Sequence, residues 1–222
     1  MNKINNKNII LVNKPLNWTS NDVVQKVKSI IKPKKIGHGG TLDPLASGLL
    51  VLGINEATKQ LQSYLEGTKT YIAEIIFGFS TDTYDMEGVK LNFTDNTPSE
   101  NEIIETLEKL KKEYKQIPPI YSAIKINGKK SYEIARENKE VILNPRDVKI
   151  YNYQIISFKN NILKIELEVS KGFYIRSLAF DIGKMNNSSS TLYSLVRTKI
   201  GNLLLEDAIG VEEIYDYWNK CE

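Results

Sequence analysis

The chain has 222 residues, of which 41% are hydrophobic and 26% are charged, so it is long enough to bury a substantial core. Its aliphatic runs are far shorter than the roughly 20 apolar residues of a membrane span, and its N-terminus lacks the apolar stretch of a signal peptide. A single cysteine, Cys221, excludes an internal disulfide, and a single histidine, His38, leaves too few ligands for a structural zinc site. We therefore expect a soluble, cytoplasmic protein with no metal.

The charge of the chain is mildly basic. The formal net charge of +3 is too small by itself to indicate a nucleic-acid partner. Arginine occurs only at positions 136, 146, 176 and 197, in a chain that is otherwise rich in lysine. Because lysine does not reproduce the planar, multidentate geometry of a guanidinium group, each arginine is a candidate for a specific role.

Hydrophobic patterning predicts the elements of the first third of the chain. Residues 8–13 form a short apolar run that is typical of a buried strand. Ser20 is the expected N-cap of an amphipathic helix over 20–32. Residues 34–48 show no hydrophobic period and contain several glycines, which predicts a loop. The next two expected elements are a buried strand over 49–54 and a helix over about 56–65.

The remaining sequence predicts a mixture of strands and helices. Ser99 is the expected N-cap of a helix that carries Leu107, Leu110 and Tyr114 on its apolar side. Residues 163–169 alternate between apolar and charged side chains, as in a strand with one buried face. The other expected elements are a strand over 71–79, an Asp-rich turn over 81–88, a short helix near 131–138, a helix through 175–182, a strand near 192–199 and a last helix ending around Trp218. This order favours an α+β fold in a single domain, with a large, mostly antiparallel sheet.

The loop over 37–44, Gly-His-Gly-Gly-Thr-Leu-Asp-Pro, is the most unusual segment of the chain. Its glycines allow the backbone to approach a ligand closely, and Pro44 restricts Asp43 to extended geometry, which suits a nucleophilic or basic carboxylate. An isolated Asp-Pro pair more often belongs to a simple turn. In a second group, over 170–176, Arg176 follows a tyrosine and has the geometry to pair with a carboxylate. These residues alone do not separate a catalytic pair from a structural one.

Several motifs resemble the TruB family of tRNA pseudouridine synthases. The segment Gly-His-Gly-Gly-Thr-Leu-Asp-Pro-Leu-Ala-Ser-Gly over 37–48 is similar to the catalytic motif of that family. Other family-like motifs follow the family order: Asn13-Lys14-Pro15, Lys69-Thr70-Tyr71, Pro118-Pro119, Tyr174-Ile175-Arg176 and Leu195-Val196-Arg197-Thr198. The resemblance extends over roughly residues 8–214, and several motifs in the correct order make chance agreement negligible.

The resemblance implies a pseudouridine-synthase catalytic fold, with a large mixed sheet flanked by helices and loops. It also implies the isomerisation of uridine to pseudouridine at position 55 in the TΨC loop of tRNA, by base flipping and without a cofactor. The segment over about 118–147 matches a thumb-like insertion of the family. The expected partner is the T-arm stem-loop of tRNA, and we expect the protein to be a monomer.

Two departures from the family pattern affect these expectations. Asn17 and Asn138 stand where the family often has glycine, and asparagine is the non-glycine residue that best tolerates left-handed backbone geometry. The chain ends at Glu222 without the C-terminal PUA-type RNA-binding domain of many relatives, so we expect weaker binding of tRNA than in longer relatives.

The resemblance also assigns roles to residues of the site. Asp43 matches the catalytic aspartate, which either attacks the base or assists at C1′. Tyr71 matches a tyrosine that stacks on the uracil, and Tyr174 and Leu195 match residues that line the uridine pocket. Arg176 matches the arginine that pairs with the aspartate.

Residues outside the base pocket are expected to hold the folded RNA. His38 is expected to fill the place that the flipped base leaves. The candidate contacts to the RNA backbone are cationic: Lys14, Lys34, Lys35, Lys59, Lys125, Lys129, Lys130 and Arg197. The alternative function is a tRNA-binding or remodelling module whose catalysis is dispensable. The joint presence of Asp43, Tyr71 and Arg176 favours the enzyme, because a remodelling module needs none of them.

Overall fold

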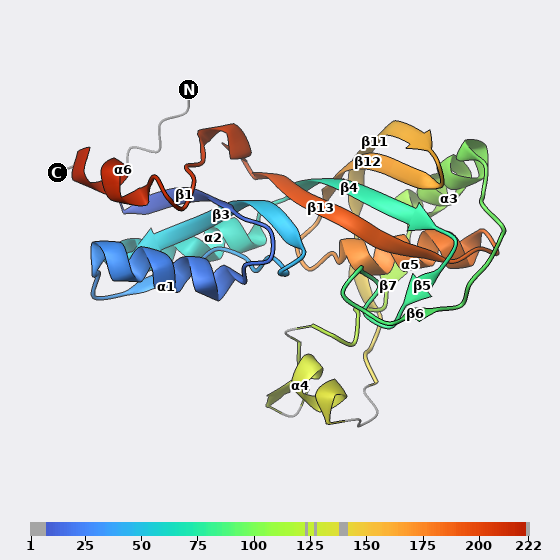
Figure 1. The fold of residues 1–222 in the computed structure, drawn as a ribbon, viewed down its shortest axis with the longest axis horizontal. Helices are drawn as coiled ribbons and strands as arrows, with labels where there is room; N and C mark the ends of the chain where they lie inside the picture. Colours follow the sequence, from blue (N-terminus) through green and yellow to red (C-terminus); the bar gives the residue numbers. More distant parts are fainter. Residues whose placement is uncertain (1–7, 123, 127, 138–141, 221–222) are drawn as a thin grey trace. The chain divides into compact units, whose positions relative to one another are not determined.

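The computed structural model describes residues 8–122, 124–126, 128–137 and 142–220. The chain groups into two compact units, of which unit 1 comprises Met1–Ile72 and Ser194–Glu222 and unit 2 comprises Ala73–Tyr193. Two strands, β4 (Lys69–Phe77) and β13 (Ser190–Ile200), each belong partly to one unit and partly to the other (Figure 1). The expectation that the chain forms one domain stays a prediction.

Unit 1 is built around strands β1 and β3. Its elements, apart from the shares of β4 and β13, are β1 (Ile9–Lys14), α1 (Ser20–Ile31), β2 (Ile36–His38), β3 (Ala46–Ile54), the 3-10 helix η1 (Asn55–Gln60), α2 (Leu61–Glu66), β14 (Leu203–Leu204), the 3-10 helix η2 (Leu205–Asp207) and α6 (Ile214–Lys220). Strand β3 pairs antiparallel with β1 and β2, and parallel with β13. The parallel pairing places Leu195 opposite Ala46 and Arg197 opposite Gly48.

Alternating residues of β1 serve two separate cores in unit 1. Ile10 and Val12 pack in a cluster with Val23 and Val27 of α1. The residues between them, Ile9 and Leu11, pack in a second cluster that includes residues of η1 and α2. Because both faces of the strand are covered, its sequence is a continuous apolar run instead of an alternating one.

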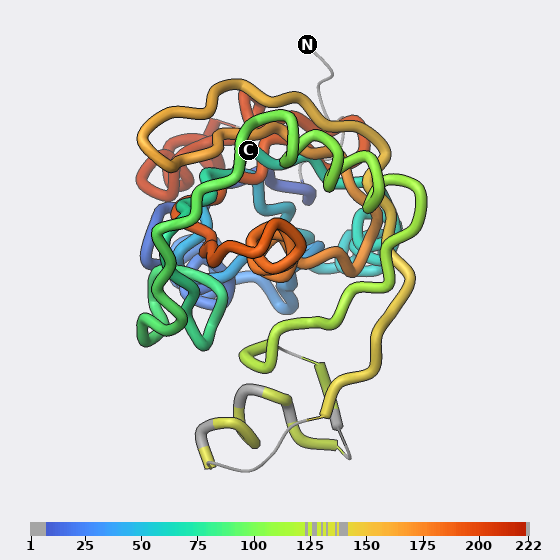
Figure 2. The backbone as a smooth tube through the Cα atoms, turned by 90° about the vertical axis from the view of Figure 1, so that its right-hand side faces the viewer, coloured from blue at the N-terminus to red at the C-terminus, as the bar shows by residue number. Residues whose placement is uncertain are grey.

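Unit 2 contains a long antiparallel hairpin. Its elements, apart from the shares of β4 and β13, are β5 (Ser80–Thr81), β6 (Lys90–Leu91), α3 (Glu100–Lys112), β7 (Tyr114–Gln116), β8 (Lys125–Ile126), β9 (Lys129–Lys130), α4 (Ser131–Arg136), β10 (Arg146–Val148), β11 (Ile150–Lys159), β12 (Ile162–Val169) and α5 (Ile175–Met185). Strands β11 and β12 form the hairpin, and α3 contacts both β11 and α5. Figure 2 looks nearly along the axis of α5 and shows α3 beside it.

The strand order confirms the expected fold class. The main path of the eight-stranded sheet is β1-β3-β13-β4-β12-β11, with β2 paired to β3 and β14 paired to β13. The pairing of β13 with β3 is parallel, whereas β1, β2, β11 and β14 pair antiparallel with their partners. The sheet is therefore mixed and mostly antiparallel, and helices flank it, as the sequence predicts.

Three local predictions were wrong in detail. Thr19, not Ser20, is the N-cap of α1: its hydroxyl accepts a hydrogen bond from the Asp22 N–H group, and the Asp22 carboxylate accepts one from the Thr19 N–H group. The segment predicted as a loop over 34–48 contains the short strand β2. Tyr114 continues the helical spacing of α3 but lies in β7, because α3 ends at Lys112.

The segment over about 118–147 leaves unit 2 from a short two-stranded stem. Strand β7 pairs antiparallel with β10, with Gln116 opposite Arg146. Beyond this stem, the part that carries α4 projects away from the sheet of its own unit (Figures 1 and 2). Helix α4 confirms the short helix expected near 131–138, and Asn138 lies outside the described residues. We call this segment the thumb.

Candidate functional site

Asp43 lies in the connection between β2 and β3, where the glycine-rich motif makes a tight turn. Its side chain is half-buried, and its carbonyl oxygen accepts a hydrogen bond from the Ala46 N–H group at 3.0 Å. Strand β3 begins at Ala46, so Asp43 is held three residues before the sheet. Gly40 and Gly48, on either side, adopt φ angles of 117° and 103°, which favour glycine.

The guanidinium group of Arg197 holds this loop from the inside of unit 1. Its Nε donates to the Leu49 carbonyl at 2.8 Å, and its two terminal nitrogens donate to the carbonyls of Thr41 (3.3 Å) and Gly40 (3.2 Å). Only 1% of Arg197 is exposed. The side chain reaches these carbonyls because β13 pairs with the start of β3.

Two more buried side chains complete the fixation of the loop. The Ser20 hydroxyl accepts a hydrogen bond from the Leu42 N–H group at 2.9 Å and donates to the Leu42 carbonyl at 3.2 Å. The Lys14 ammonium donates to the Pro44 carbonyl at 3.4 Å, and also to the carbonyls of Pro15 and Trp18. Every carbonyl from residue 40 to residue 44 therefore accepts a hydrogen bond within unit 1.

Burial contradicts two of the predicted contacts to the RNA backbone. Lys14 is 0% exposed and Arg197 is 1% exposed, so neither reaches a phosphate at the surface. Their charges are compensated by backbone carbonyls, a structural use of cations that residue type alone does not reveal. The scarcity of arginine singled out Arg197 in the sequence. The bonding of Ser20 to the loop was not predicted, because its place at the start of a helix indicated an N-cap instead.

Tyr71 and Leu195 lie in the same unit as Asp43. Tyr71 is on β4 and is 9% exposed, and Leu195 is on β13 and is 8% exposed. The parallel register places Leu195 opposite Ala46, the residue whose N–H group bonds to Asp43. The Asp43 loop leads into β3, and the next two strands in the sheet, β13 and β4, carry Leu195 and Tyr71.

His38 lies at the end of β2, opposite Leu52 of β3, and is half-buried. Burial lowers the pKa of its imidazole below 6.5, the charge of Arg197 lowers it further, and a hydrogen bond with the Gly40 backbone acts in the opposite direction. The ring is therefore neutral at physiological pH. Within the described ranges, no three His, Cys, Asp or Glu side chains come together as a metal site requires.

Tyr174 and Arg176 lie in unit 2, at the start of α5. Arg176 is buried and pairs with the buried Asp85 at an N···O distance of 3.6 Å. Its terminal nitrogens also donate to the carbonyls of Thr83 at 3.1 Å and Tyr121 at 2.9 Å. Asp85 lies in the Asp-rich turn, but its pairing with Arg176 was not predicted. The pairing of Arg176 with Asp43 joins residues of different units and stays a prediction.

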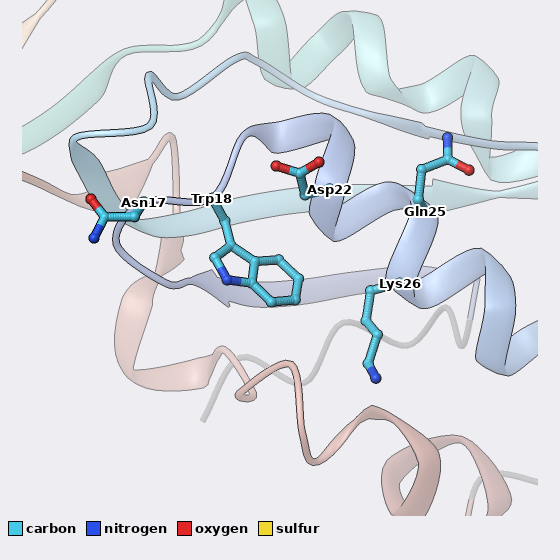
Figure 3. Close-up of a pocket in the computed structure, with 5 residues that line it drawn as sticks. All are labelled: Asn17, Trp18, Asp22, Gln25 and Lys26. Carbon is cyan, nitrogen blue, oxygen red and sulfur yellow. The ribbon is translucent and has the colours of Figure 1, made fainter. Parts of the chain in front are cut away.

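A groove of about 390 Å³ opens at the start of α1 (Figure 3). It is lined by Asn17, Trp18, Asp22, Gln25 and Lys26. The N–H group of Asn17 donates to the Pro44 carbonyl at 2.9 Å, so the groove borders the Asp43 loop. Asn17 has a φ of 65°, which confirms the left-handed geometry expected where relatives have glycine. An aromatic ring beside a lysine is a combination that binds single-stranded nucleic acids.

The other predicted contacts to the RNA backbone are all lysines. Lys34, Lys35 and Lys125 are exposed. Lys59 and Lys129 are also exposed and form surface ion pairs, with Glu56 at 2.8 Å and with Glu137 at 3.4 Å. The structure does not describe the side chain of Lys130. Along the described residues, no helix is both long and apolar enough to cross a membrane.

Known proteins are similar to this chain in sequence and in fold. Residues 28–175 match the model of the TruB family pseudouridylate synthase (N terminal domain). The tRNA pseudouridine synthase B of Ureaplasma urealyticum is 56% identical over 97% of this chain and 95% of that protein, and that of Clostridium acetobutylicum is 44% identical over 93% and 71%. A solved Cbf5-Nop10-Gar1 complex contains a chain with a TM-score of 0.73 and 27% identity, over 95% of this chain and 54% of that one.

A solved pseudouridylate synthase matches the fold more distantly. Its TM-score is 0.50 at 17% identity, over 95% of this chain and 73% of that one. The family match includes the Asp43 loop, Tyr71 and Tyr174. The extent of these matches shows that the chain belongs to the TruB family of pseudouridylate synthases.

Proposed function

We propose that this protein isomerises uridine to pseudouridine at position 55 in the TΨC loop of tRNA, with Asp43 as the nucleophile. Family membership supports the reaction, and the relatives named tRNA pseudouridine synthase B support tRNA as the substrate. The observation that carries the proposal is the fixation of the loop over 40–44 by Arg197, Ser20 and Lys14. A loop held in this way orients a carboxylate before the substrate arrives, and preorganisation of this kind favours nucleophilic attack.

The reaction balances without a redox partner. The bond between N1 and C1′ of the uridine breaks, and a new bond forms between C5 and C1′. C5 loses its proton to the solvent and N1 takes one up. Asp43 either attacks the uracil ring or assists at C1′ of the ribose, and both routes need its carboxylate held close to the nucleoside.

The proposal gives the neighbouring residues distinct tasks. Tyr71 stacks on the uracil, and Leu195 and Tyr174 line the uridine pocket. The small exposed fractions of Tyr71 and Leu195 agree with positions at the bottom of a pocket. The pairing of Arg176 with Asp43, which the family resemblance implies, belongs to the same proposal.

Base flipping requires that the protein compensates the lost stacking, which costs a few kcal/mol. His38 suits this task because its imidazole ring is flat and because its lowered pKa leaves the ring uncharged at physiological pH. An uncharged imidazole enters a stack of bases at a smaller desolvation cost than a cation. We propose that the His38 ring takes the place of the flipped uridine.

Exposed lysines are proposed to follow the phosphates of the T-arm. Lys34 and Lys35 lie immediately before β2, which leads into the Asp43 loop. Lys125 and Lys129 lie on the thumb. Lysines on two such segments are able to hold the RNA backbone although the net charge is only +3. We propose further that the protein acts in the cytoplasm as a monomer.

The experiment uses unmodified tRNA transcript with tritium at C5 of its uridines, because isomerisation releases this label to water. We compare wild-type protein with Asp43→Asn, and we use Asp207→Asn as the control because Asp207 is an exposed carboxylate of the same unit. We expect release by the wild type and by the control, no release by Asp43→Asn, and no release when uridine 55 is replaced.

Each contrary outcome identifies the part that fails. Equal release by Asp43→Asn would remove Asp43 from its proposed role. Release that persists after replacement of uridine 55 would contradict the proposed position. Salt-sensitive tRNA binding by the wild-type protein without any release would support the remodelling module.

A further inference from the structure

Gln116 makes a two-bond connection to the backbone of Tyr174. Its Nε2 donates to the Tyr174 carbonyl at 3.0 Å, and its Oε1 accepts from the Tyr174 N–H group at 2.8 Å. The side chain of Gln116 is 0% exposed, although it lies on the stem of the thumb. The two bonds hold Tyr174 immediately before the first residue of α5.

The amide of Gln116 is itself held in one orientation. Tyr114 lies two residues earlier on the same buried face of β7, and its hydroxyl donates to the Asp181 carboxylate at 2.6 Å. Burial raises the pKa of Tyr114, and the Asp181 charge raises it further, so the phenol keeps its proton. The Tyr174 backbone fixes which end of the Gln116 amide is which, because its N–H group needs the oxygen and its carbonyl needs the NH2 group, and the Tyr114 proton is given to Asp181 instead.

Two further contacts tie the start of α5 to the chain that enters the thumb. The Ser177 hydroxyl donates to the Ile117 carbonyl at 2.8 Å. Arg176 donates to the Tyr121 carbonyl at 2.9 Å. The first turn of α5 is therefore bonded at several points to the six residues over 116–121, where the thumb begins.

We propose that Gln116 is a positioning residue for the isomerisation, which holds Tyr174 in place for contact with the uridine. This inference rests on the proposed function, in which Tyr174 lines the uridine pocket. Gln116 acts through the Tyr174 backbone and does not touch the base. Its amide supplies one donor and one acceptor to the same peptide segment, so a side chain of similar shape without an amide loses both bonds.

The first test replaces Gln116 with methionine, which has a similar length and no strong hydrogen-bonding group. We expect kcat for tritium release to fall about tenfold to a hundredfold, since displacement of a pocket residue by about 1 Å has effects of this size. The KM for tRNA should change less than twofold, because the RNA-binding surface is intact. Ser190→Ala is the matched control: it removes a buried hydrogen bond to the Ala179 carbonyl, further along α5, at 2.6 Å.

The second test replaces Gln116 with glutamate, which restores the connection in a pH-dependent way. A protonated carboxyl accepts from the Tyr174 N–H group and donates to its carbonyl, whereas an ionised one has no donor. Burial raises the pKa of such a carboxyl, Tyr114 and Asp181 oppose its ionisation, and Arg146 across the stem favours it. We expect the kcat of Gln116→Glu, divided by that of the wild type, to rise as the pH falls.

The outcomes separate this inference from the proposed function. Tritium release by the wild type, with a kcat for Gln116→Met within twofold of that for Ser190→Ala, would overturn the inference and leave the function intact. A pH-independent ratio for Gln116→Glu would also overturn it, and this test applies even where Gln116→Met fails to fold. Absence of release by the wild type would instead contradict the proposed function itself.

Discussion

Arg176 and Arg197 are both buried, and each donates hydrogen bonds to backbone carbonyls in loops. A guanidinium group suits this position because it is planar and presents several N–H donors at fixed angles. A lysine ammonium serves several carbonyls only where they converge on one nitrogen, as at Lys14, whereas Arg197 uses three separate nitrogens to reach the carbonyls of Leu49, Thr41 and Gly40. The two buried arginines are therefore part of the construction of the site.

Arg197→Lys tests this role. We expect the free energy of unfolding to fall by about 2 to 5 kcal/mol, because buried carbonyls lose their donors at roughly 1 to 3 kcal/mol each. Tritium release should slow at least about tenfold, as the Asp43 loop loses its fixed position. Denaturant titration and single-turnover release measure both effects, and the exposed Arg146→Lys is the control. Unchanged stability together with a weaker salt dependence of tRNA binding would make Arg197 an RNA contact instead.

His38 gives a prediction of how stability depends on pH. The effect can be assigned to this residue because the chain has no other histidine. Burial lowers its pKa in the folded state, so the unfolded chain binds a proton more readily. The contribution to stability is therefore present above 6.5 and is lost as the pH falls from 6.5 through the lowered pKa. NMR titration of the imidazole should give a value below 6.5, and His38→Gln should remove this part of the acid destabilisation. A measured value at or above 6.5 would contradict the burial that we describe.

At the scale of elements, the close pairing of β3 with β13 depends on Gly48. A Cβ atom at this position would lie against the Arg197 carbonyl oxygen and 2.8 Å from the Arg197 nitrogen. The φ of 103° adds backbone strain for any other residue. Gly48 therefore allows the two strands to approach at the point where the loop is fixed.

Gly48→Ala should destabilise the protein more than Gly201→Ala does. Both glycines have a positive φ, but a Cβ at Gly201 meets no atom within 4 Å. The difference between the two variants measures the collision together with the greater backbone strain at the φ of 103°, and we expect it to exceed about 1 kcal/mol. Denaturant titration of both variants measures it, and equal losses would show that β3 and β13 are able to separate without cost.

Elements whose signals are local could be predicted from the sequence. Helix α3 begins after Ser99 with a capping box, and the cap and the apolar spacing that indicate it lie within the helix itself. The strand β2 could not be predicted, because three residues give no alternation and the strand exists only by pairing with β3. Tyr114 has helical spacing from α3, but the helix ends and the stem pairing with β10 decides its conformation.

The candidate site divides in the same way. Asp43 could be identified because its glycine-rich surroundings and its Asp-Pro pair lie in one continuous segment. The burial of Lys14 could not be predicted, because the Pro44 carbonyl that it bonds lies 30 residues away. The connection between Gln116 and Tyr174 spans 58 residues, and glutamine has no preference that indicates it. Contacts of this range appear only when the topology is known.

At the scale of the whole molecule, exposed lysines should determine how salt affects tRNA binding. The net charge is small, so the location of each lysine matters more than the total. Removal of Lys34 and Lys35 together should reduce the slope of log K against log salt by about 1 to 2, since each lost phosphate contact contributes about 1. Binding measured at several salt concentrations gives this slope.

The control for this measurement removes Lys109 and Lys112, which lie in the last part of α3 and are exposed. Both double variants lower the net charge equally. If the two slopes change by the same amount, binding responds to the overall charge, and the proposed contacts at Lys34 and Lys35 are wrong.

The sequence separation between Arg197 and the loop that it holds also sets a delay during protein synthesis. Arg197 follows Gly40 by 157 residues, so on a ribosome that adds roughly 5 to 20 residues per second it is synthesised about 8 to 30 seconds later. Throughout that interval the nascent chain carries Asp43 without the guanidinium group that holds its loop. A chain released before Arg197 is synthesised therefore lacks a finished site, and the enzyme gains its activity only after that residue has joined the fold.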